Sequence, residues 1–410
     1  MAQARLRGTT PGPSPPSLDP SASMACGSSS ADTMRGAVLR AKAQKPEGKV
    51  LYPGQKYDLI VSSIPKPRCV AGKALVRVVA AGVNPVDCKL ILPSWIQHAF
   101  GRDYCGVVEE ITEETSAKRG IKVGDTVMGM SSGSCCEYIV ADTETMTKVP
   151  DNMTPEQAAG MGVAYMTSYD AIFAGTTVGR PPVGENTRVL IIGGSGGTGL
   201  AALQLARRCA CARLVATVCS GRNEQLVKQE GADVVFDYTK IDFAATPAEE
   251  LKRIMTEEAV KQMGTEEKRP APDDFRGEFD LVYDCVSSME DHDYRPVANQ
   301  LLAPGAGHYV AINAARPAFW MQGLLARATG LGSWVLPSRE DLFLPAPNRE
   351  KVDNMSKWFG EGKLRVNVDT VVDFQKAASD ANANLNEAID RQLSRRATGK
   401  VVIGNIGSPK

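Results

Sequence analysis

The sequence has few of the residues and patterns that structural metal sites and disulfide frameworks require. Its 410 residues include only three histidines, His98, His292 and His308, and none lies near another histidine or a cysteine pair at ligand spacing. The ten cysteines are scattered and contain no CxxC pair, so neither a structural zinc nor a secreted disulfide framework is expected. Scattered thiols are typical of a reducing compartment, and we expect a cytoplasmic protein.

An excess of one charge and long apolar runs are also missing. Lys+Arg and Asp+Glu both number 47, so the formal net charge is zero. This balance argues against a partner recruited by bulk charge, such as nucleic acid. No apolar run is long enough to span a bilayer. The composition is that of an ordinary globular enzyme, and the chain is longer than one core usually holds, so two domains are expected.

Residues 1–33 differ from the rest of the chain. They are rich in proline and serine and have almost no large apolar residues, so we expect a disordered extension. Arg5 and Arg7 among many serines raise the alternative of a transit peptide for a mitochondrion or plastid. Five prolines and the lack of a clear amphipathic helix favour a plain extension.

The rest of the chain divides by its pattern of strands and helices. Short strand candidates separated by glycine and proline fill residues 34–155 and predict a small β-barrel-like domain. Residues 156–315 alternate apolar strands with helices, which is typical of a parallel sheet with helices on both faces. An insertion near residues 241–278 is charged and long for one crossover, and no function follows from it. Residues 316–410 contain a linker, two amphipathic helices and a final strand, so the fold class is α/β.

The segment VLIIGGSGGTGLAALQLA, residues 189–206, carries the most informative motif. Its GxGxxG pattern, Gly194 to Gly199, follows an apolar strand and opens a helix, which is the context of a dinucleotide-binding turn. Glycines let the backbone approach a pyrophosphate, whose charge faces the amides at the helix N-terminus, and Ser195 and Thr198 add hydroxyl donors. The alternative is a turn with a purely structural role, but the strand, the helix and the downstream βα units favour the cofactor site.

The end of the next strand indicates which dinucleotide binds. A site for NAD usually has an acidic residue there to bind the ribose hydroxyls. This chain has Cys219-Ser220-Gly221-Arg222 and no acid before Glu224. Ser220 and Arg222 suit a 2′-phosphate instead, so we predict NADPH rather than NADH. For Arg222 the alternative is a solvated residue in the first turn of a helix.

Eight short segments, in this order, resemble the medium-chain dehydrogenase/reductase superfamily: AAGVNPVD, GRDYCGVVEE, VGDTVMG, EYIVAD, VLIIGGSGGTG, GAD, YDCV and ATGKVVI. More narrowly, the chain looks like the zinc-independent quinone oxidoreductase branch, which includes zeta-crystallin and the reticulon-interacting protein. The resemblance implies a GroES-like catalytic domain interrupted by a Rossmann domain, with the chain returning to the catalytic domain at its end. The nicotinamide would lie in the cleft between the two domains. Family members are often dimers, so a homodimer is a further expectation.

The resemblance also implies roles for individual residues. Carried over by motif, the cofactor-binding residues are Thr167 near the nicotinamide, Ser195, Gly196, Gly197 and Thr198 at the pyrophosphate, Ser220 and Arg222 at the 2′-phosphate, Tyr238 near the adenosine phosphate, and Arg396 reaching in from the catalytic domain.

The chain departs from the zinc-dependent members of this family at both metal-ligand segments. Val83-Asn84 stands where they have a cysteine, Arg102-Asp103 stands where they have His-Glu, and the four-cysteine structural lobe is absent. No metal site is therefore expected, which argues against an alcohol dehydrogenase. The tyrosine that some enoyl reductases of the family carry after Asn-Pro is also absent, and this weakens an enoyl-thioester assignment.

Without a metal, the reaction must suit an acceptor that takes a hydride readily, such as a quinone or an α,β-unsaturated carbonyl compound. We therefore predict an NADPH-dependent quinone or enone reductase. An enoyl-thioester reductase of lipid or polyketide synthesis and an NADPH-binding scaffold with little turnover are the alternatives. Asn84 is the predicted donor to the acceptor oxygen, and Asp87 is predicted to fix the loop or relay a proton. A plain turn at Asn84-Pro85 and an N-cap at Asp87 are the structural alternatives.

Overall fold

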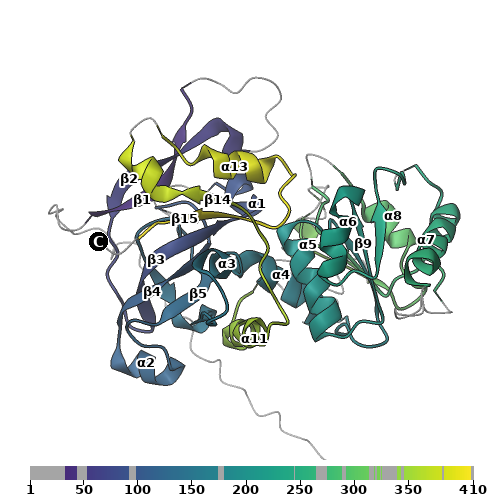
Figure 1. Ribbon diagram of the computed structural model, residues 1–410, viewed down its shortest axis with the longest axis horizontal. Coiled ribbons are helices and arrows are strands. Elements are labelled where there is room, and N and C mark those ends of the chain that lie inside the picture. The colour runs from purple at the N-terminus through teal and green to yellow at the C-terminus, as the bar shows by residue number, and fades with distance from the viewer. Residues whose placement is uncertain are drawn as a thin grey trace, which may run out of the picture.

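The computed structural model has two parts that lie side by side, one containing the first and last described strands and the other the middle of the chain (Figure 1). A buried apolar core runs through their junction, since Met128 and Val402 of the first part pack in the same cluster as Leu200 and Val215 of the second. The structure describes residues 33–43, 53–91, 98–173, 180–243, 245–264, 275–288, 292–313, 318, 321–323, 325, 339–342, 346–380 and 383–407.

Two regions singled out in the sequence fall wholly or largely outside the described residues. The N-terminal extension, residues 1–33, is described only at Thr33, where the first strand begins. The later part of the charged insertion near residues 241–278 lies mostly within residues 265–274, which are also outside. The predictions for both regions therefore stay predictions.

The first part is a β-rich domain. β1 (Thr33–Ala41) and β2 (Tyr57–Pro65) form an antiparallel pair. The larger sheet has seven strands, of which six run in the order β14 (Val368–Asp373), β15 (Lys400–Gly404), β3 (Lys73–Val83), β4 (Asp103–Ile111), β5 (Thr126–Met130) and β7 (Met146–Lys148), while β6 (Tyr138–Asp142) pairs with β3. Neighbouring strands are antiparallel except β14 and β15, which are parallel. The last two strands of the chain thus complete a sheet that its early strands begin.

The second part is a parallel sheet with the strand order of a dinucleotide-binding fold. Its order is β10 (Val234–Asp237), β9 (Leu214–Cys219), β8 (Arg188–Ile192), β11 (Leu281–Asp284), β12 (His308–Ala311) and β13 (Glu340–Leu342). Counted in chain order this is 3-2-1-4-5-6, the arrangement that binds dinucleotides where the order reverses. Because β13 belongs to this sheet, the sheet continues past residue 315, where the sequence pattern placed its end.

Alternate side chains of β8 enter two different cores, which explains why the strand reads as continuously apolar. Val189 and Ile191 pack in the core that contains Leu200 of the following helix. Leu190 and Ile192 pack in a second core that contains Leu251 of helix α7 (Ala248–Met263). A parallel strand buried on both faces needs apolar residues at every position, and the predicted α/β class is confirmed.

The helices connect and cover these sheets. Their bounds are α1 (Pro85–Lys89), α2 (Glu113–Arg119), α3 (Pro155–Ala159), α4 (Gly162–Phe173), α5 (Gly197–Gln204), α6 (Glu224–Gln229), α7 (Ala248–Met263), α8 (Arg295–Gln300), α11 (Arg349–Gly360), α12 (Phe374–Ser379) and α13 (Asn386–Leu393), with short turns at η2 (Pro53–Lys56), η3 (Thr143–Thr145), η4 (Leu205–Cys209) and η5 (Gly221–Asn223).

Local sequence accounts for the start of α3, where Thr154 is the N-cap. Thr154 Oγ1 accepts from Gln157 N at 3.3 Å, Gln157 Oε1 accepts from Thr154 N at 3.0 Å, and Pro155 occupies the first helical position. This reciprocal pair of bonds satisfies amides that the first helical turn leaves without partners. After α3 the helical segment breaks at Gly160-Met161, and α4 begins at Gly162.

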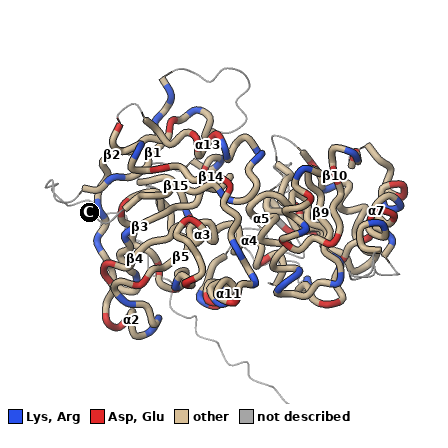
Figure 2. Tube along the Cα trace, viewed as in Figure 1, with Lys and Arg blue, Asp and Glu red and all other residues tan. Residues whose placement is uncertain are grey.

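Both signs of charge are interspersed along the chain, and α7 itself carries acidic and basic residues (Figure 2). Of the helices within the described ranges, none combines the length and apolar character that crossing a membrane requires.

Candidate active site

The Gly-rich turn between β8 and α5 is closed by contacts that only glycine permits. Gly193 has φ +86°, in the left-handed region. A Cβ on Gly194 would collide with the hydroxyl of Thr217, and a Cβ on Gly199 would collide with the carbonyl oxygen of Gly193. Thr217 is itself fixed, because its hydroxyl donates to Ile191 O at 2.8 Å. The backbone therefore lies bare at the carboxyl end of β8.

The start of α5 has the properties of a diphosphate site. Its N-cap is Gly196, which has no side chain to satisfy the first amides, and these amides lack intrahelical partners. They open at the carboxyl edge of β8, beside the point where the strand order reverses between β8 and β11. Ser195, Gly197 and Thr198 are all partly exposed. This arrangement could hold a diphosphate, and the pyrophosphate contacts expected from the sequence for these residues stay predictions.

The residues predicted at the 2′-phosphate lie together at the end of β9 and β10. Ser220 is half-buried, whereas Arg222 and Tyr238 are exposed. Asp237, the last residue of β10, lies beside them; the sequence did not point to it, because the acidic residue of a NAD site is expected at the end of β9. The β9–β10 register pairs it with Cys219, which brings a carboxylate to this edge.

Asp237 is held by the backbone around it. Its carboxylate accepts from Thr239 N at 3.0 Å and from the Thr239 hydroxyl at 2.8 Å, and also from the amide of Gly221. Burial acts to raise the pKa of Asp237, but these hydrogen bonds outweigh it and hold the pKa below its usual range. A fixed negative charge therefore stands next to the predicted 2′-phosphate residues.

Helix α4 meets the Gly-rich turn through the neighbour of the residue that the sequence singled out. Thr167 is buried and its hydroxyl donates to Val163 O at 2.6 Å, within its own helix. Ser168, which sequence reasoning missed, donates its hydroxyl to Thr198 O at 2.9 Å. The contact between α4 and the turn thus runs through Ser168, and the role predicted for Thr167 at the nicotinamide stays a prediction.

A buried polar cluster occupies one end of the catalytic sheet, where β15, β3 and β4 lie side by side. The register pairs Val401 with Val83 and Gly82 with Asp103, so the ends of these strands meet. Lys400 Nζ donates to Asn84 Oδ1 and, at 3.1 Å, to Asp103 Oδ2. The cluster consists of Asn84, Asp87, Arg102, Asp103 and Lys400.

Asn84 is the hub of this polar cluster. Its side-chain Nδ2 donates to Asp103 Oδ2 at 3.0 Å and to Asp87 Oδ2 at 3.2 Å, while its Oδ1 accepts from Lys400. Both hydrogens of the amide therefore already have carboxylate acceptors. Donation from Asn84 to an acceptor oxygen would require one of these bonds to be exchanged.

Asp87 has a local structural role, but the N-cap that the sequence offered as its alternative is wrong, because Asp87 lies inside α1. Asn84 is the N-cap of α1, and the Asp87 carboxylate, three positions on, accepts the backbone N–H of Asn84 at 2.8 Å. Its other oxygen pairs with Arg102. Burial raises the pKa of Asp87 above its usual value, although the Arg102 charge opposes this shift. Asp87 thus fixes the loop; a proton relay through it stays a prediction.

The loop before β15 brings the catalytic part against the Gly-rich turn. A Cβ on Gly197 would lie 2.9 Å from Lys400 Cδ and 3.2 Å from the carbonyl oxygen of Gly399. Arg396, on the same loop, is exposed. Asp369 anchors the loop by accepting from Thr398 N at 2.9 Å. The contact between Arg396 and the cofactor that the resemblance implies stays a prediction.

The chemistry of this cluster does not suit a divalent cation. Its two carboxylates already face the cations Arg102 and Lys400, which would repel a metal ion. Nowhere in the described ranges do three His, Cys, Asp or Glu side chains gather in a way that would hold a metal.

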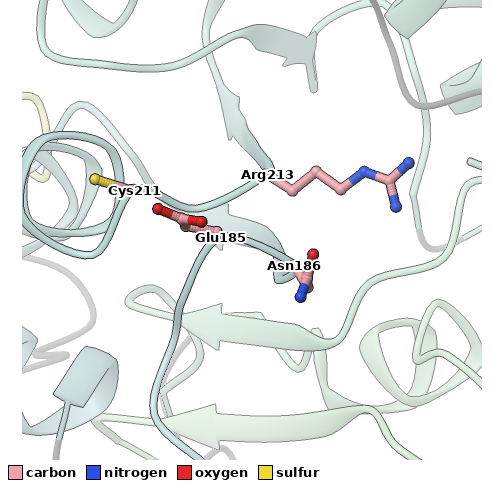
Figure 3. A pocket seen from close by; sticks show the side chains of 4 residues that line it. All are labelled: Glu185, Asn186, Cys211 and Arg213. Carbon is pink, nitrogen blue, oxygen red and sulfur yellow. The ribbon is translucent and has the colours of Figure 1, made fainter.

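A surface hollow lies at the opposite edge of the parallel sheet. It is lined by Glu185, Asn186, Cys211 and Arg213, and Figure 3 shows the Arg213 side chain extending away from Glu185 and Cys211. These residues precede β8 and β9, so the hollow lies at the amino ends of the strands. Dinucleotides bind at the carboxyl ends, and the hollow is therefore separate from the candidate active site.

Comparison with known proteins supports both parts of this architecture. A family model for an alcohol dehydrogenase GroES-like domain matches residues 70–169, and one for a zinc-binding dehydrogenase matches residues 230–403. A quinone oxidoreductase from Coxiella burnetii has the same fold, with a TM-score of 0.63 and 22% identity over 91% of this chain and 99% of that one. A mycobacterial protein solved in complex with NADPH gives a TM-score of 0.62 at 22% identity over 90% of this chain and 99% of that one.

Among curated relatives, a trans-enoyl reductase of a Fusarium species is 38% identical over 189 residues, 43% of this chain and 53% of the relative. Another from Aspergillus terreus is 29% identical over 348 residues, 81% of this chain and 86% of the relative. A quinone oxidoreductase of Lama guanicoe is 35% identical over 173 residues, 40% of this chain and 50% of the relative. The chain spans about half the length of the Fusarium and Lama guanicoe relatives. With residues 70–169 and 230–403 both matched by models of this kind, the chain belongs to the medium-chain dehydrogenase/reductase superfamily.

Proposed function

We propose that the protein is a zinc-independent reductase that uses NADPH to reduce a quinone or an α,β-unsaturated carbonyl compound. One observation carries the proposal: the bare turn at Gly194–Gly199 lies against the loop that leads into Lys400, and Lys400 belongs to the Asn84 polar cluster. A dinucleotide held at the turn would extend toward the cluster, which forms one wall of the domain junction. NADPH, when bound, supplies the hydride.

The side chains of the cluster would define the acceptor pocket. Lys400 and Arg102 neutralise Asp103 and Asp87, which leaves a buried, nearly neutral wall suited to an uncharged acceptor. Asn84 would orient the acceptor oxygen by exchanging one of its amide hydrogen bonds, and the apolar junction around the cluster would exclude water. The lysine and arginine at the carboxylates support the proposal that no zinc takes part.

The choice of NADPH over NADH rests on Ser220 and Arg222, which present a hydroxyl and a guanidinium at the edge of β9. Asp237 opposes this preference through its negative charge, so we expect the discrimination to be moderate. Tyr238 is 50% exposed at the same edge and is free to cover the adenosine phosphate.

A trans-enoyl reductase is the second candidate, because relatives with that name match the chain at up to 38–40% identity over about half their length. Enoyl thioesters and enones share the same unsaturated carbonyl, so the proposed pocket suits either. The residues after Asn84-Pro85 contain no tyrosine up to Tyr104, and Tyr104 is wholly buried. This segment therefore lacks the tyrosine that some enoyl reductases of the family carry after Asn-Pro.

The deciding experiment measures cofactor binding first and turnover second. Calorimetry with NADPH and NADH would give both dissociation constants, and NADPH oxidation would then be followed with a quinone, an enone and an enoyl thioester. We expect turnover with the quinone or the enone. Faster turnover with the enoyl thioester would favour the second candidate, and NADPH binding without turnover on any acceptor would favour a scaffold.

A further inference from the structure

We propose that Lys400 is a positioning residue that fixes the Gly-rich turn relative to the Asn84 polar cluster, and so sets the distance between the cofactor and the acceptor. This inference rests on the proposed function. Lys400 lies at the first position of β15 and escaped sequence reasoning, although it is the only charged residue in the strand KVVIG.

The stem of Lys400 runs between glycines of two different helical segments. Its Cγ lies 3.2 Å from where a Cβ of Gly160 would stand, between α3 and α4. Its Cδ lies 2.9 Å from where a Cβ of Gly197 would stand, in the first turn of α5. Both distances are below ordinary van der Waals contact, so a side chain at either position would displace the lysine. The stem is therefore in direct contact with the backbone of the turn predicted to hold the pyrophosphate.

The ammonium group of Lys400 ends in the polar cluster. It donates to Asn84 Oδ1 and to Asp103 Oδ2, and Asp103 Oδ1 accepts from Val163 N at 2.8 Å, in the first turn of α4. A Cβ on Gly162 would collide with Asp103 Oδ1, so glycine is required for this approach too. One side chain thus connects the turn, the start of α4 and the ends of β3 and β4.

Because the Lys400–Asp103 pair is buried, we infer that it fixes the spacing of its segments rather than adding stability. The Lys400 side chain is 4% exposed and that of Asp103 is 0% exposed. A buried ion pair contributes little net stability, because desolvation of both charges offsets their attraction. Its two ends, however, cannot separate without leaving a charge unpaired in the interior. The pair therefore holds its segments at a fixed spacing.

The consequence for turnover follows from the sensitivity of hydride transfer to distance. A shift of about 1 Å in the reacting groups can cost on the order of 100-fold in rate. Loss of the Lys400 connection would loosen the turn against the acceptor wall while leaving the amides of the turn intact. Loss of Lys400 should therefore leave NADPH affinity nearly unchanged and slow the transfer of hydride.

The test is the double variant Lys400→Met/Asp103→Asn, in which the stem remains and no unpaired charge is buried. The matched control is Lys148→Met/Asp125→Asn, the same substitutions at a surface pair in the catalytic part, 2.9 Å apart. For each protein, calorimetry gives the NADPH dissociation constant, and the fluorescence lifetime of bound NADPH reports the nicotinamide environment without turnover. Turnover with the preferred acceptor and the isotope effect from NADPH deuterated at C4 complete the comparison.

We expect the NADPH dissociation constant of the double variant to stay within about 3-fold of wild type, while kcat falls roughly 10- to 100-fold. The isotope effect should rise and the bound lifetime should change, whereas the control should match wild type in all four measurements. Unchanged kcat, isotope effect and lifetime would overturn the inference. A proportional loss of NADPH affinity with native melting would also overturn it, because Lys400 would then be a binding cation.

Two further results keep the test decisive. If the double variant does not fold, Asp103→Asn alone replaces the charged acceptor of Lys400 by a neutral amide and should give the same pattern at smaller size. A wild-type pattern would refute the inference. If wild-type protein binds NADPH but reduces no acceptor, the proposed function fails, and the lifetime of bound NADPH still tests the role of Lys400 separately.

Discussion

Asn84 stands at the end of β3 with every polar atom of its side-chain amide engaged. At this position the sequence left open a choice between a turn and a pocket residue. The structure contains features of both, since Asn84 caps α1 and also accepts from Lys400 across 316 positions of sequence. A residue that served only a local turn would not be expected to hold a buried lysine from the far end of the chain.

Replacing Asn84 with alanine tests the pocket role. The variant removes one acceptor of Lys400 and the proposed donor to the acceptor oxygen, so we expect kcat/KM to fall about 10- to 100-fold. NADPH affinity, measured by calorimetry, should stay within about 3-fold of wild type. Asn186→Ala, at an exposed position in the second part, is the matched control. Full turnover by Asn84→Ala would show that Asn84 serves only the local turn.

At Asp237 the prediction concerns cofactor choice. Asp237→Asn keeps oxygen and nitrogen atoms for the local hydrogen bonds but removes a negative charge beside Ser220 and Arg222. Repulsion between one surface carboxylate and a neighbouring phosphate costs on the order of 1 kcal/mol. Without that repulsion, the preference for NADPH over NADH should rise several-fold. The ratio of the two dissociation constants measures it, and the gain should shrink as salt rises. A salt-independent ratio equal to wild type would show that Asp237 does not face the phosphate.

At the scale of elements, the β8–α5 connection depends on glycines that approach backbone. Gly199→Ala forces a methyl group against the carbonyl oxygen of Gly193, so the turn must open. We expect NADPH affinity to fall by about 100-fold or more and the melting temperature to drop. Gly184→Ala is the matched control, because a Cβ there meets nothing within 4 Å. Calorimetry and thermal melting of both variants make the comparison; normal NADPH binding by Gly199→Ala would place the cofactor elsewhere.

The β14 strand anchors the loop that leads into β15, and this anchor is sensitive to pH. Asp369 accepts from Arg391 and from Thr398, and the Arg391 bonds, the largest effect, hold the pKa of Asp369 well below its usual range. A carboxylate whose folded pKa is depressed contributes its full stabilisation above its unfolded pKa of about 3.9, and loses it progressively as the pH falls from there through the lower folded pKa.

Asp369→Asn should therefore destabilise the protein by about 2 kcal/mol at pH 7, as expected for loss of charge-assisted hydrogen bonds. The difference in unfolding free energy between the variant and wild type should shrink as the pH falls below about 4. Urea unfolding at pH 7 and pH 3 measures it, with Asp151→Asn, at an exposed position, as the control. A difference that is the same at both pH values would show that the charge of Asp369 does not matter.

At the scale of the whole molecule, the sequence predicts the elements better than their contacts. The α/β class, the turn at Gly194–Gly199 and the cap at Thr154 follow from local patterns, because strand period, glycine spacing and capping residues act over a few positions. The break between α3 and α4 does not follow, since it depends on the approach of Gly162 to Asp103. That contact joins the first turn of α4 to the first residue of β4, which lie far apart in the sequence.

The missed site residues have the same origin. Lys400 and Asp237 reach the site through the registers of β15 with β3 and of β10 with β9, and a single sequence contains no record of register. A charged residue at the head of the apolar strand KVVIG is the one local signal that points to Lys400. For Asp237 the signal is an acidic residue at the end of the third strand rather than the second.

The central claim is reduction of an organic acceptor by NADPH without a metal ion. The most direct measurement is the kcat/KM for NADPH-dependent reduction of a quinone or enone by enzyme treated with a chelator and then dialysed. We predict the same kcat/KM before and after treatment, no gain on adding zinc, and a higher value with NADPH than with NADH. Activity lost on chelation and restored by zinc, or equal values for the two cofactors, would contradict the account.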